Sequence, residues 1–171
     1  MVQKKLKVFD AFTNALKNLD TQDSALYSFG RNRLALTHAL ALHLKSEFDN
    51  QESPVFSDMC LSVLKSQKTL IPDILVHNRQ SSKKILAVMC RNDYLTEEEQ
   101  KDLIAFSDSV QCELVMAVSF FPQKNYMLVY RVSKQGIEYY HFDRNTMTAS
   151  AVRKVLKQTS DDSRQLKLKL K

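Results

Sequence analysis

The chain has 171 residues, of which 44% are hydrophobic, and it carries a formal net charge of +6. This length suits a single compact domain that buries most of its surface, so folding requires neither a metal nor a disulfide framework. Because the chain contains only two glycines, it lacks the Gly-rich phosphate-binding loops of nucleotide hydrolases and dinucleotide-binding enzymes, whereas the positive charge favours a polyanionic partner such as nucleic acid.

Two helices are predicted in the N-terminal part of the chain. Apolar residues recur at helical spacing from Phe9 to Leu19 and predict a short first helix, which ends at the polar stretch DTQDS. Asp23 or Ser24 can then cap a second helix, in which leucine and alanine recur at intervals of three and four residues. This pattern predicts one long, largely buried helix over residues 24–48.

Strands are predicted next, over residues 55–64, 70–77 and 84–90, because these runs are apolar and bounded by polar residues. The last two are separated by the polar turn NRQSS, so we expect them to be antiparallel neighbours in a sheet. Thr96 precedes Glu99 by three residues, as in a capping box, and predicts the start of a helix after this pair of strands.

The rest of the chain predicts three more strands and a closing helix. The segment TASAVRKVLKQT predicts the helix, over residues 148–159. Alternating or continuous apolar patterns predict strands over residues 112–121, 126–133 and 136–143. The order of elements indicates an α/β or α+β fold with a mixed central β-sheet flanked by helices. We expect a single domain over residues 1–160, followed by a basic C-terminal tail over residues 161–171.

Cysteine and histidine give no sign of a metal or redox site. Cys60, Cys90 and Cys112 are odd in number and far apart, which excludes a self-contained disulfide framework and indicates a reducing compartment. His38 and His43 stand five residues apart on the predicted helix, a poor spacing for one metal ion, so we expect core or interfacial roles for them. No serine or cysteine lies in the sequence context of a nucleophile elbow.

The sequence predicts no membrane partner. The start MVQKKLKVFDAFTNALKNL is basic but has no unbroken apolar core, and no later apolar run approaches the roughly 20 residues that span a bilayer. Together with the unpaired cysteines, these features favour a soluble, cytoplasmic protein.

The segments LIPDILVHN and KKILAVMCR, with the helix before them and the helix and strand after them, resemble the PD-(D/E)XK, or restriction endonuclease-like, nuclease superfamily. In these enzymes a Pro-Asp opens one strand, and the next strand ends in an acidic residue, one further residue and a lysine. Two carboxylates there bind Mg²⁺ through hard oxygen ligands, and the metal activates water. The resemblance implies a restriction endonuclease-like core with a site at Pro72 and Asp73.

Three positions of this chain depart from the superfamily pattern. Met89 occupies the position of the second carboxylate, and its soft, neutral thioether is no ligand for Mg²⁺. Arg91 occupies the position of the lysine, but a guanidinium stays protonated and cannot accept a proton from water. Arg33 stands where the superfamily has an acidic helix residue, so it would repel a metal. We therefore expect a vestigial catalytic motif, with Asp73 in ion-pair reach of Arg33 or Arg91 and no bound metal.

The favoured function is that of a catalytically impaired nuclease-like protein, without a cofactor, that acts by binding nucleic acid or a protein partner. The residues predicted to bind are Arg33, Arg79, Lys83, Lys84 and Arg91. A second possibility is an interaction module with no nucleic-acid role, whose positive charge comes from the tail alone.

A third possibility is an active Mg²⁺-dependent nuclease with a rearranged site. If the second strand continues past Arg91, Asp93 shares a face with Met89 and Arg91 and becomes a displaced metal ligand beside Asp73. A simpler role for Asp93 is to end the strand before the following helix.

Overall fold

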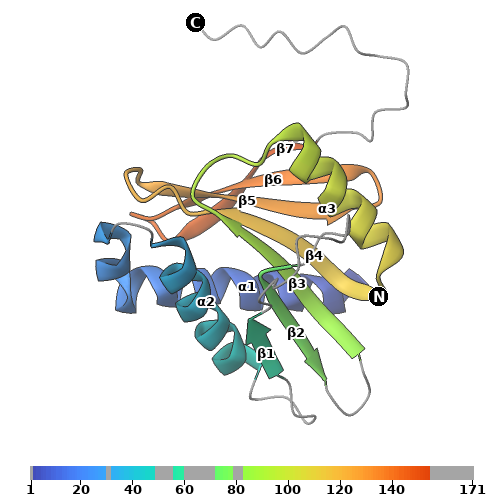
Figure 1. Cartoon of the computed structure of the whole chain (residues 1–171), viewed down its shortest axis with the longest axis horizontal. Helices are drawn as coiled ribbons and strands as arrows, with labels where there is room; N and C mark the ends of the chain where they lie inside the picture. The colour runs from blue at the N-terminus through green and yellow to red at the C-terminus, as the bar shows by residue number, and fades with distance from the viewer. Residues whose placement is uncertain (1, 30–31, 49–55, 60–71, 79–82, 155–171) are drawn as a thin grey trace, which may run out of the picture.

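The computed structural model describes residues 2–29, 32–48, 56–59, 72–78 and 83–154. Over these residues the chain folds into a central mixed β-sheet with helices on both faces (Figure 1). The predicted α/β class, with a mixed sheet flanked by helices, is therefore confirmed. Among the helices of the described residues, none is long and apolar enough to cross a membrane.

The described part of the chain contains three α-helices and one short 3₁₀-helix, which are α1 (Val2–Gln22), η1 (Ser24–Ser28), α2 (Arg33–Phe48) and α3 (Glu97–Ser109). It also contains seven strands that pair in chain order, which are β1 (Phe56–Met59), β2 (Ile74–Asn78), β3 (Lys83–Arg91), β4 (Cys112–Ser119), β5 (Tyr126–Ser133), β6 (Gly136–Asp143) and β7 (Thr148–Lys154).

The order of strand directions brings three chain segments to one edge of the sheet. β2 pairs antiparallel with both β1 and β3, and α3 returns the chain so that β4 lies parallel to β3. Strands β4 to β7 form an antiparallel meander. The carboxyl ends of the parallel strands β3 and β4 therefore share an edge (Figure 1). Because β2 runs the opposite way, with Ile74 paired to Val88, Asp73 at its start lies at that same edge.

Two apolar layers cover the two faces of the sheet. Helices α1 and α2 pack on one face and α3 packs on the other, so β3 and β4 are buried on both sides, as parallel strands usually are. Leu36, Leu40 and Leu44 anchor α2, and each fully buried side chain contributes about 1.5–3 kcal/mol. Successive residues of β3 alternate between the layers: Leu86, Val88 and Cys90 face α1 and α2, whereas Ala87 and Met89 face α3.

The prediction of one helix over residues 24–48 is wrong. Ser24–Ser28 forms the 3₁₀-helix η1, and α2 begins only at Arg33. The buried Asn32 explains the start of α2: its carbonyl accepts the N–H of Leu36, while its side-chain amide turns back to donate to the carbonyl of Tyr27. Asparagine favours helix starts because its side chain competes for backbone groups. The break leaves Arg33 in the first turn of α2.

The predicted closing helix is also wrong, because Thr148–Lys154 forms strand β7, antiparallel to β6. The carboxylate of Asp143 accepts the N–H groups of Asn145 and Thr146, and this turn folds the chain back along β6. An open sheet edge therefore outweighs the local helical pattern. The last residues of the predicted helix and the basic tail lie outside the described residues, as does much of the predicted strand over residues 55–64, of which Phe56–Met59 forms β1.

Candidate functional site

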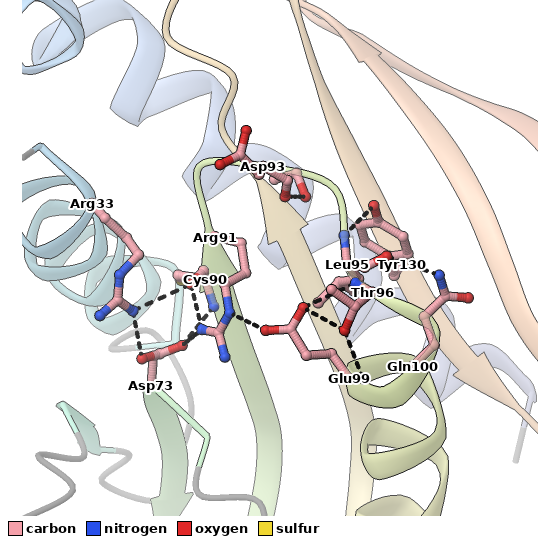
Figure 2. A network of polar contacts seen from close by, with 11 residues as sticks. Arg33, Asp73, Cys90, Arg91, Asp93, Leu95, Thr96, Glu99, Gln100 and Tyr130 are labelled. Atoms are coloured by element: carbon pink, nitrogen blue, oxygen red, sulfur yellow. Dashed lines mark hydrogen bonds and ion pairs between the residues drawn. The ribbon is translucent and has the colours of Figure 1, made fainter.

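Asp73 is the centre of a polar network at the shared edge of β2 and β3 (Figure 2). Its carboxylate Oδ1 accepts a hydrogen bond from Arg33 Nη1 at 3.0 Å, and its Oδ2 accepts one from Arg91 Nη1 at 3.1 Å. Oδ2 also accepts the backbone N–H of Cys90 at 2.7 Å. The sequence predicted an ion pair of Asp73 with Arg33 or Arg91; this is confirmed, and the structure shows both pairs. Each carboxylate oxygen of Asp73 therefore already accepts at least one hydrogen bond.

The two arginines are also held by the backbone of β3. Nη1 of Arg91 donates to the carbonyl of Cys90 at 2.8 Å, and Nη1 of Arg33 reaches the same carbonyl at 3.3 Å. The side chain of Asp73 is 21% exposed, compared with 43% for Arg33 and 30% for Arg91. The carboxylate thus lies beneath two guanidinium groups that cover it from different elements, α2 and β3.

Glu99 completes this group, which we call the Asp73 network (Arg33, Asp73, Arg91 and Glu99). Nε of Arg91 donates to Glu99 Oε1 at 2.7 Å, so the guanidinium bridges the carboxylates of Asp73 and Glu99 (Figure 2). Burial raises the pKa of Glu99, but hydrogen bonds from Arg91 and Thr96 outweigh it, so the pKa is lowered overall. Two guanidinium groups thus face two carboxylates, and the charges of the network balance.

The capping box predicted from Thr96 and Glu99 is confirmed, and it fixes the position of Glu99. The N–H of Glu99 donates to Thr96 Oγ1 at 3.1 Å, and Oε2 of Glu99 accepts the N–H of Thr96 at 3.0 Å. The preceding Leu95 is held as well, because its N–H donates to the hydroxyl of the buried Tyr130 at 3.2 Å. One carboxylate therefore caps α3 with one oxygen and binds Arg91 with the other.

Met89 belongs to the apolar layer under α3 and is only 1% exposed. Its neighbour Cys90 faces the opposite layer, where burial, and then the charge of Asp73, raises the pKa of the thiol to about 12. A thiol with so high a pKa is a poor nucleophile and a poor metal ligand at neutral pH. Neither side chain therefore provides a metal ligand next to Asp73, although both residues lie on the neighbouring strand β3.

Asp93 is not brought to Asp73. It lies in the bend between β3 and α3, its side chain is exposed, and its carboxylate points away from Asp73 (Figure 2). Its backbone carbonyl accepts the hydroxyl of Ser119 at 2.7 Å, which ties this bend to the end of β4. Over the residues that the structure describes, no group of three or more His, Cys, Asp or Glu side chains could hold a metal ion.

The remaining predicted residues lie elsewhere or outside the described part. Lys83 and Lys84 open β3, so they lie roughly 25 Å from Arg91 at its other end, and Lys83 Nζ is 3.8 Å from Glu113 Oε2. Arg79 lies outside the described residues. His43 is partly buried and bonds Asp23 at 2.7 Å, whereas His38 is exposed on α2. Of the four predicted binding residues that the structure describes, the two lysines therefore lie at one end of β3 and the two arginines at the other.

A second polar group at the same edge was missed from the sequence. We call it the Lys124 cluster (Tyr94, Phe121, Lys124 and Tyr126). Lys124 Nζ donates to the hydroxyls of Tyr94 and Tyr126 at 3.0 and 3.1 Å, and it lies 4.4 Å from the centroid of the Phe121 ring. These residues follow β3, follow β4 and open β5, so no short sequence spacing connects them.

Comparisons of this chain with protein-family models, with curated proteins and with solved structures find no match.

Proposed function

We propose that this protein is a PD-(D/E)XK nuclease-like protein that has lost metal-dependent cleavage and acts by binding. The observation that carries the proposal is the position of Arg91, whose guanidinium bridges the carboxylates of Asp73 and Glu99. In a metal-dependent nuclease, a divalent cation neutralises such neighbouring carboxylates. Here a permanently charged side chain of the protein supplies that positive charge.

The order of elements supports the assignment to the superfamily. A helix, three antiparallel strands, a second helix and a strand parallel to the third strand follow one another along the chain. Asp73 directly precedes the second of these strands, next to the segment of β3 that contains Met89 and Arg91. Arg33 reaches Asp73 from the helix before the strands. The order of elements and the contacts of Asp73 therefore support the resemblance proposed from the sequence.

The chemistry of the network argues against cleavage. Mg²⁺ requires several oxygen ligands in near-octahedral geometry at about 2.0–2.1 Å. Both oxygens of Asp73 already accept hydrogen bonds from cationic or backbone donors, and Met89 offers only sulfur. A metal would have to displace two guanidinium groups from one carboxylate. We infer that the position of the former active site now serves to stabilise the fold.

Nucleic acid is the partner that the net charge of +6 favours, with a contribution from the C-terminal part of the sequence. Residues 155–171 contain five lysines or arginines and only two aspartates. A protein partner is the second candidate, because Asp73 and Glu99 neutralise the arginines that would otherwise contact phosphate groups. The two candidates differ in how binding should depend on salt and on the tail.

The first experiment measures cleavage. Purified protein is incubated with single- and double-stranded DNA and RNA in Mg²⁺ or Mn²⁺, beside Asp73→Ala and Asp93→Ala variants. We expect no metal-dependent cleavage by any of the three proteins, because the oxygen ligands are incomplete. Cleavage by the wild type that both substitutions abolish would overturn the proposal and establish an active nuclease that uses Asp73 and Asp93.

The second experiment measures binding of a labelled oligonucleotide at increasing salt concentration. We expect weak, sequence-independent binding that falls steeply with salt, because lysine and arginine would neutralise phosphates. Deleting residues 164–171 distinguishes binding by the basic tail from binding by the domain. Binding that disappears with the tail would exclude the domain as the nucleic-acid reader and favour a protein partner, while binding that is insensitive to salt would contradict the electrostatic account.

A further inference from the structure

The Lys124 cluster is an ammonium-binding group on the surface of the protein. Nζ of Lys124 has two phenol oxygens as acceptors, which also bond each other at 3.0 Å. The rings of Tyr94, Phe121 and Tyr126 lie 4.7, 4.4 and 5.3 Å from Nζ. Tyr94 is 54% exposed, so the cation lies at the surface. The partners of Lys124 are neutral oxygens and ring faces, which are groups that can bind an ammonium ion.

The backbone holds this arrangement in a strained conformation. Phe121 has φ 44°, a left-handed value that is an outlier for a bulky aromatic residue. The N–H of Lys124 donates to the carbonyl of Phe121 at 2.9 Å, which closes a turn with Pro122 at its second position. Arg144 also holds this turn, because its Nη1 donates to the carbonyl of Lys124 at 3.1 Å. Strain of this kind often marks binding sites, where it orients side chains.

Carboxylates flank the cluster on two sides. Asp93 directly precedes Tyr94 and is exposed. Asp143 pairs with Tyr126 in the register of β5 and β6, so these two side chains share a face of the sheet. Neither carboxylate is among the acceptors of Lys124 Nζ, which are the two tyrosine hydroxyls. Both carboxylates thus place negative charge next to residues of the cluster, and Asp143 Oδ1 also accepts the N–H groups of Asn145 and Thr146.

From this geometry we infer that the Lys124 cluster is a docking site for a lysine side chain of a basic protein segment, and that Lys124 occupies the site in the free protein. The incoming ammonium group would make the same bonds to Tyr94 and Tyr126, and Lys124 would move into water. The carboxylates of Asp93 and Asp143 would attract the neighbouring basic residues of the segment. This inference does not rest on the proposed loss of nuclease activity.

Occupation by Lys124 lowers the affinity for any competing ammonium group, because only molecules with a vacant site can bind it. Lys124→Ala vacates the site and also removes one positive charge. Lys134→Ala is the matched control. Lys134 is exposed in the turn between β5 and β6, so its substitution removes the same charge at a position outside the cluster. A real site predicts different outcomes for the two variants, whereas a general change in charge predicts similar ones.

The test is titration of the full chain with hexalysine peptide, followed by calorimetry and by the NMR signals of the tyrosine rings. We expect Lys124→Ala to bind hexalysine roughly tenfold or more tightly than the wild type does, and Lys134→Ala to differ from the wild type by less than about twofold. Equal affinities for Lys124→Ala and Lys134→Ala would overturn the proposal. So would ring signals of Tyr94 and Tyr126 that do not shift on binding.

Two further arms identify the ligand. In the Lys124→Ala background, Tyr94→Phe removes one hydroxyl acceptor but keeps the ring, and we expect it to reverse most of the gain in affinity. Unchanged affinity would show that the phenol oxygens do not bind the ammonium group, which contradicts the proposal. Spermine is titrated in parallel, and binding of this free polyamine as tight as that of hexalysine would overturn the assignment to a protein segment.

Discussion

The Asp73 network and the Lys124 cluster share one edge of the sheet, yet they hold their cations in opposite ways. In the network, two guanidinium groups face two carboxylates, and backbone groups of Cys90 complete the contacts. In the cluster, one ammonium group is held by neutral phenols and rings, in a turn at the surface. In the Asp73 network the positive and negative charges balance. In the Lys124 cluster the cation has only neutral partners, so another ammonium group could replace it.

The difference indicates that a positive charge near a candidate site has to be weighed against the groups that already pair with it. Arg33 and Arg91 were predicted to bind a partner, but their charges are already matched by Asp73 and Glu99. Displacing either arginine would leave a partly buried carboxylate without its counter-ion, which is costly. Lys124 can leave its partners without leaving a charge unpaired, because the phenols and rings are neutral. The comparison predicts that substitutions in the network change stability and that those in the cluster change binding.

Asp73→Ala should have the largest effect on stability. It leaves Arg33, Arg91 and the N–H of Cys90 without their shared acceptor, so we expect the free energy of unfolding to fall by about 2–4 kcal/mol. The half-exposed Arg33 contributes least to this loss because water screens it. Urea denaturation of the two proteins at neutral pH measures the difference.

Asp73→Asn is the control for this substitution. It keeps an oxygen for the N–H of Cys90 but removes the charge, so we expect an intermediate loss of about 1–2 kcal/mol. Equal stability of Asp73→Ala and the wild type would mean that the network does not stabilise the fold, and the proposed structural role of the Asp73 network would then fail.

Local signals in the sequence predicted part of the fold, and contacts between distant residues decided the rest. The NRQSS turn and the spacing of Thr96 and Glu99 predicted the β2–β3 pair and the start of α3 correctly. The continuous helix over residues 24–48 failed because Asn32 bonds back to Tyr27. The prediction of a helix over residues 148–159 failed because part of this segment pairs with β6, and a local sequence pattern does not include that contact.

The candidate site divides in the same way. The Pro-Asp motif located Asp73, and the resemblance to a nuclease superfamily located Arg33 and Arg91. Glu99 was recognised only as a capping residue, since its second contact, to Arg91, depends on how α3 packs against β3. The Lys124 cluster joins residues up to 32 positions apart through a strained turn, and no spacing rule predicts such a meeting.

Glu99→Gln should have a smaller effect, which depends on pH. Glutamine can still complete the capping box, so the substitution mainly removes the charge that faces Arg91. We expect a loss of about 1 kcal/mol at neutral pH. Because the folded-state pKa of Glu99 lies below its ordinary value of 4.5, its contribution is present above that value and is lost as the pH falls through the folded-state pKa.

The measurement is urea denaturation of the wild type and Glu99→Gln between neutral and acidic pH. The two stabilities should converge as the pH falls. Glu98→Gln removes a carboxylate from the same helix turn, but at an exposed position, and controls for the helix dipole. A difference between wild type and Glu99→Gln that is constant with pH, or that Glu98→Gln reproduces, would contradict an ion pair with Arg91.

Lys124→Ala should have the smallest effect on stability, with no measurable change in the urea midpoint, because Lys124 lies at the surface and the substitution leaves no charged group without a partner. Its effect should appear in the titration of Tyr94. Hydrogen bonds from Tyr126 and from Lys124 lower the pKa of Tyr94, so removing the ammonium group should raise that pKa towards its ordinary value. Tyrosinate absorbance measured during an alkaline titration tests this, with Tyr94→Phe identifying which part of the signal belongs to Tyr94. A large loss of stability in Lys124→Ala would place the cluster with the Asp73 network as a structural element, and an unchanged titration of Tyr94 would mean that the ammonium group does not bind its hydroxyl in solution.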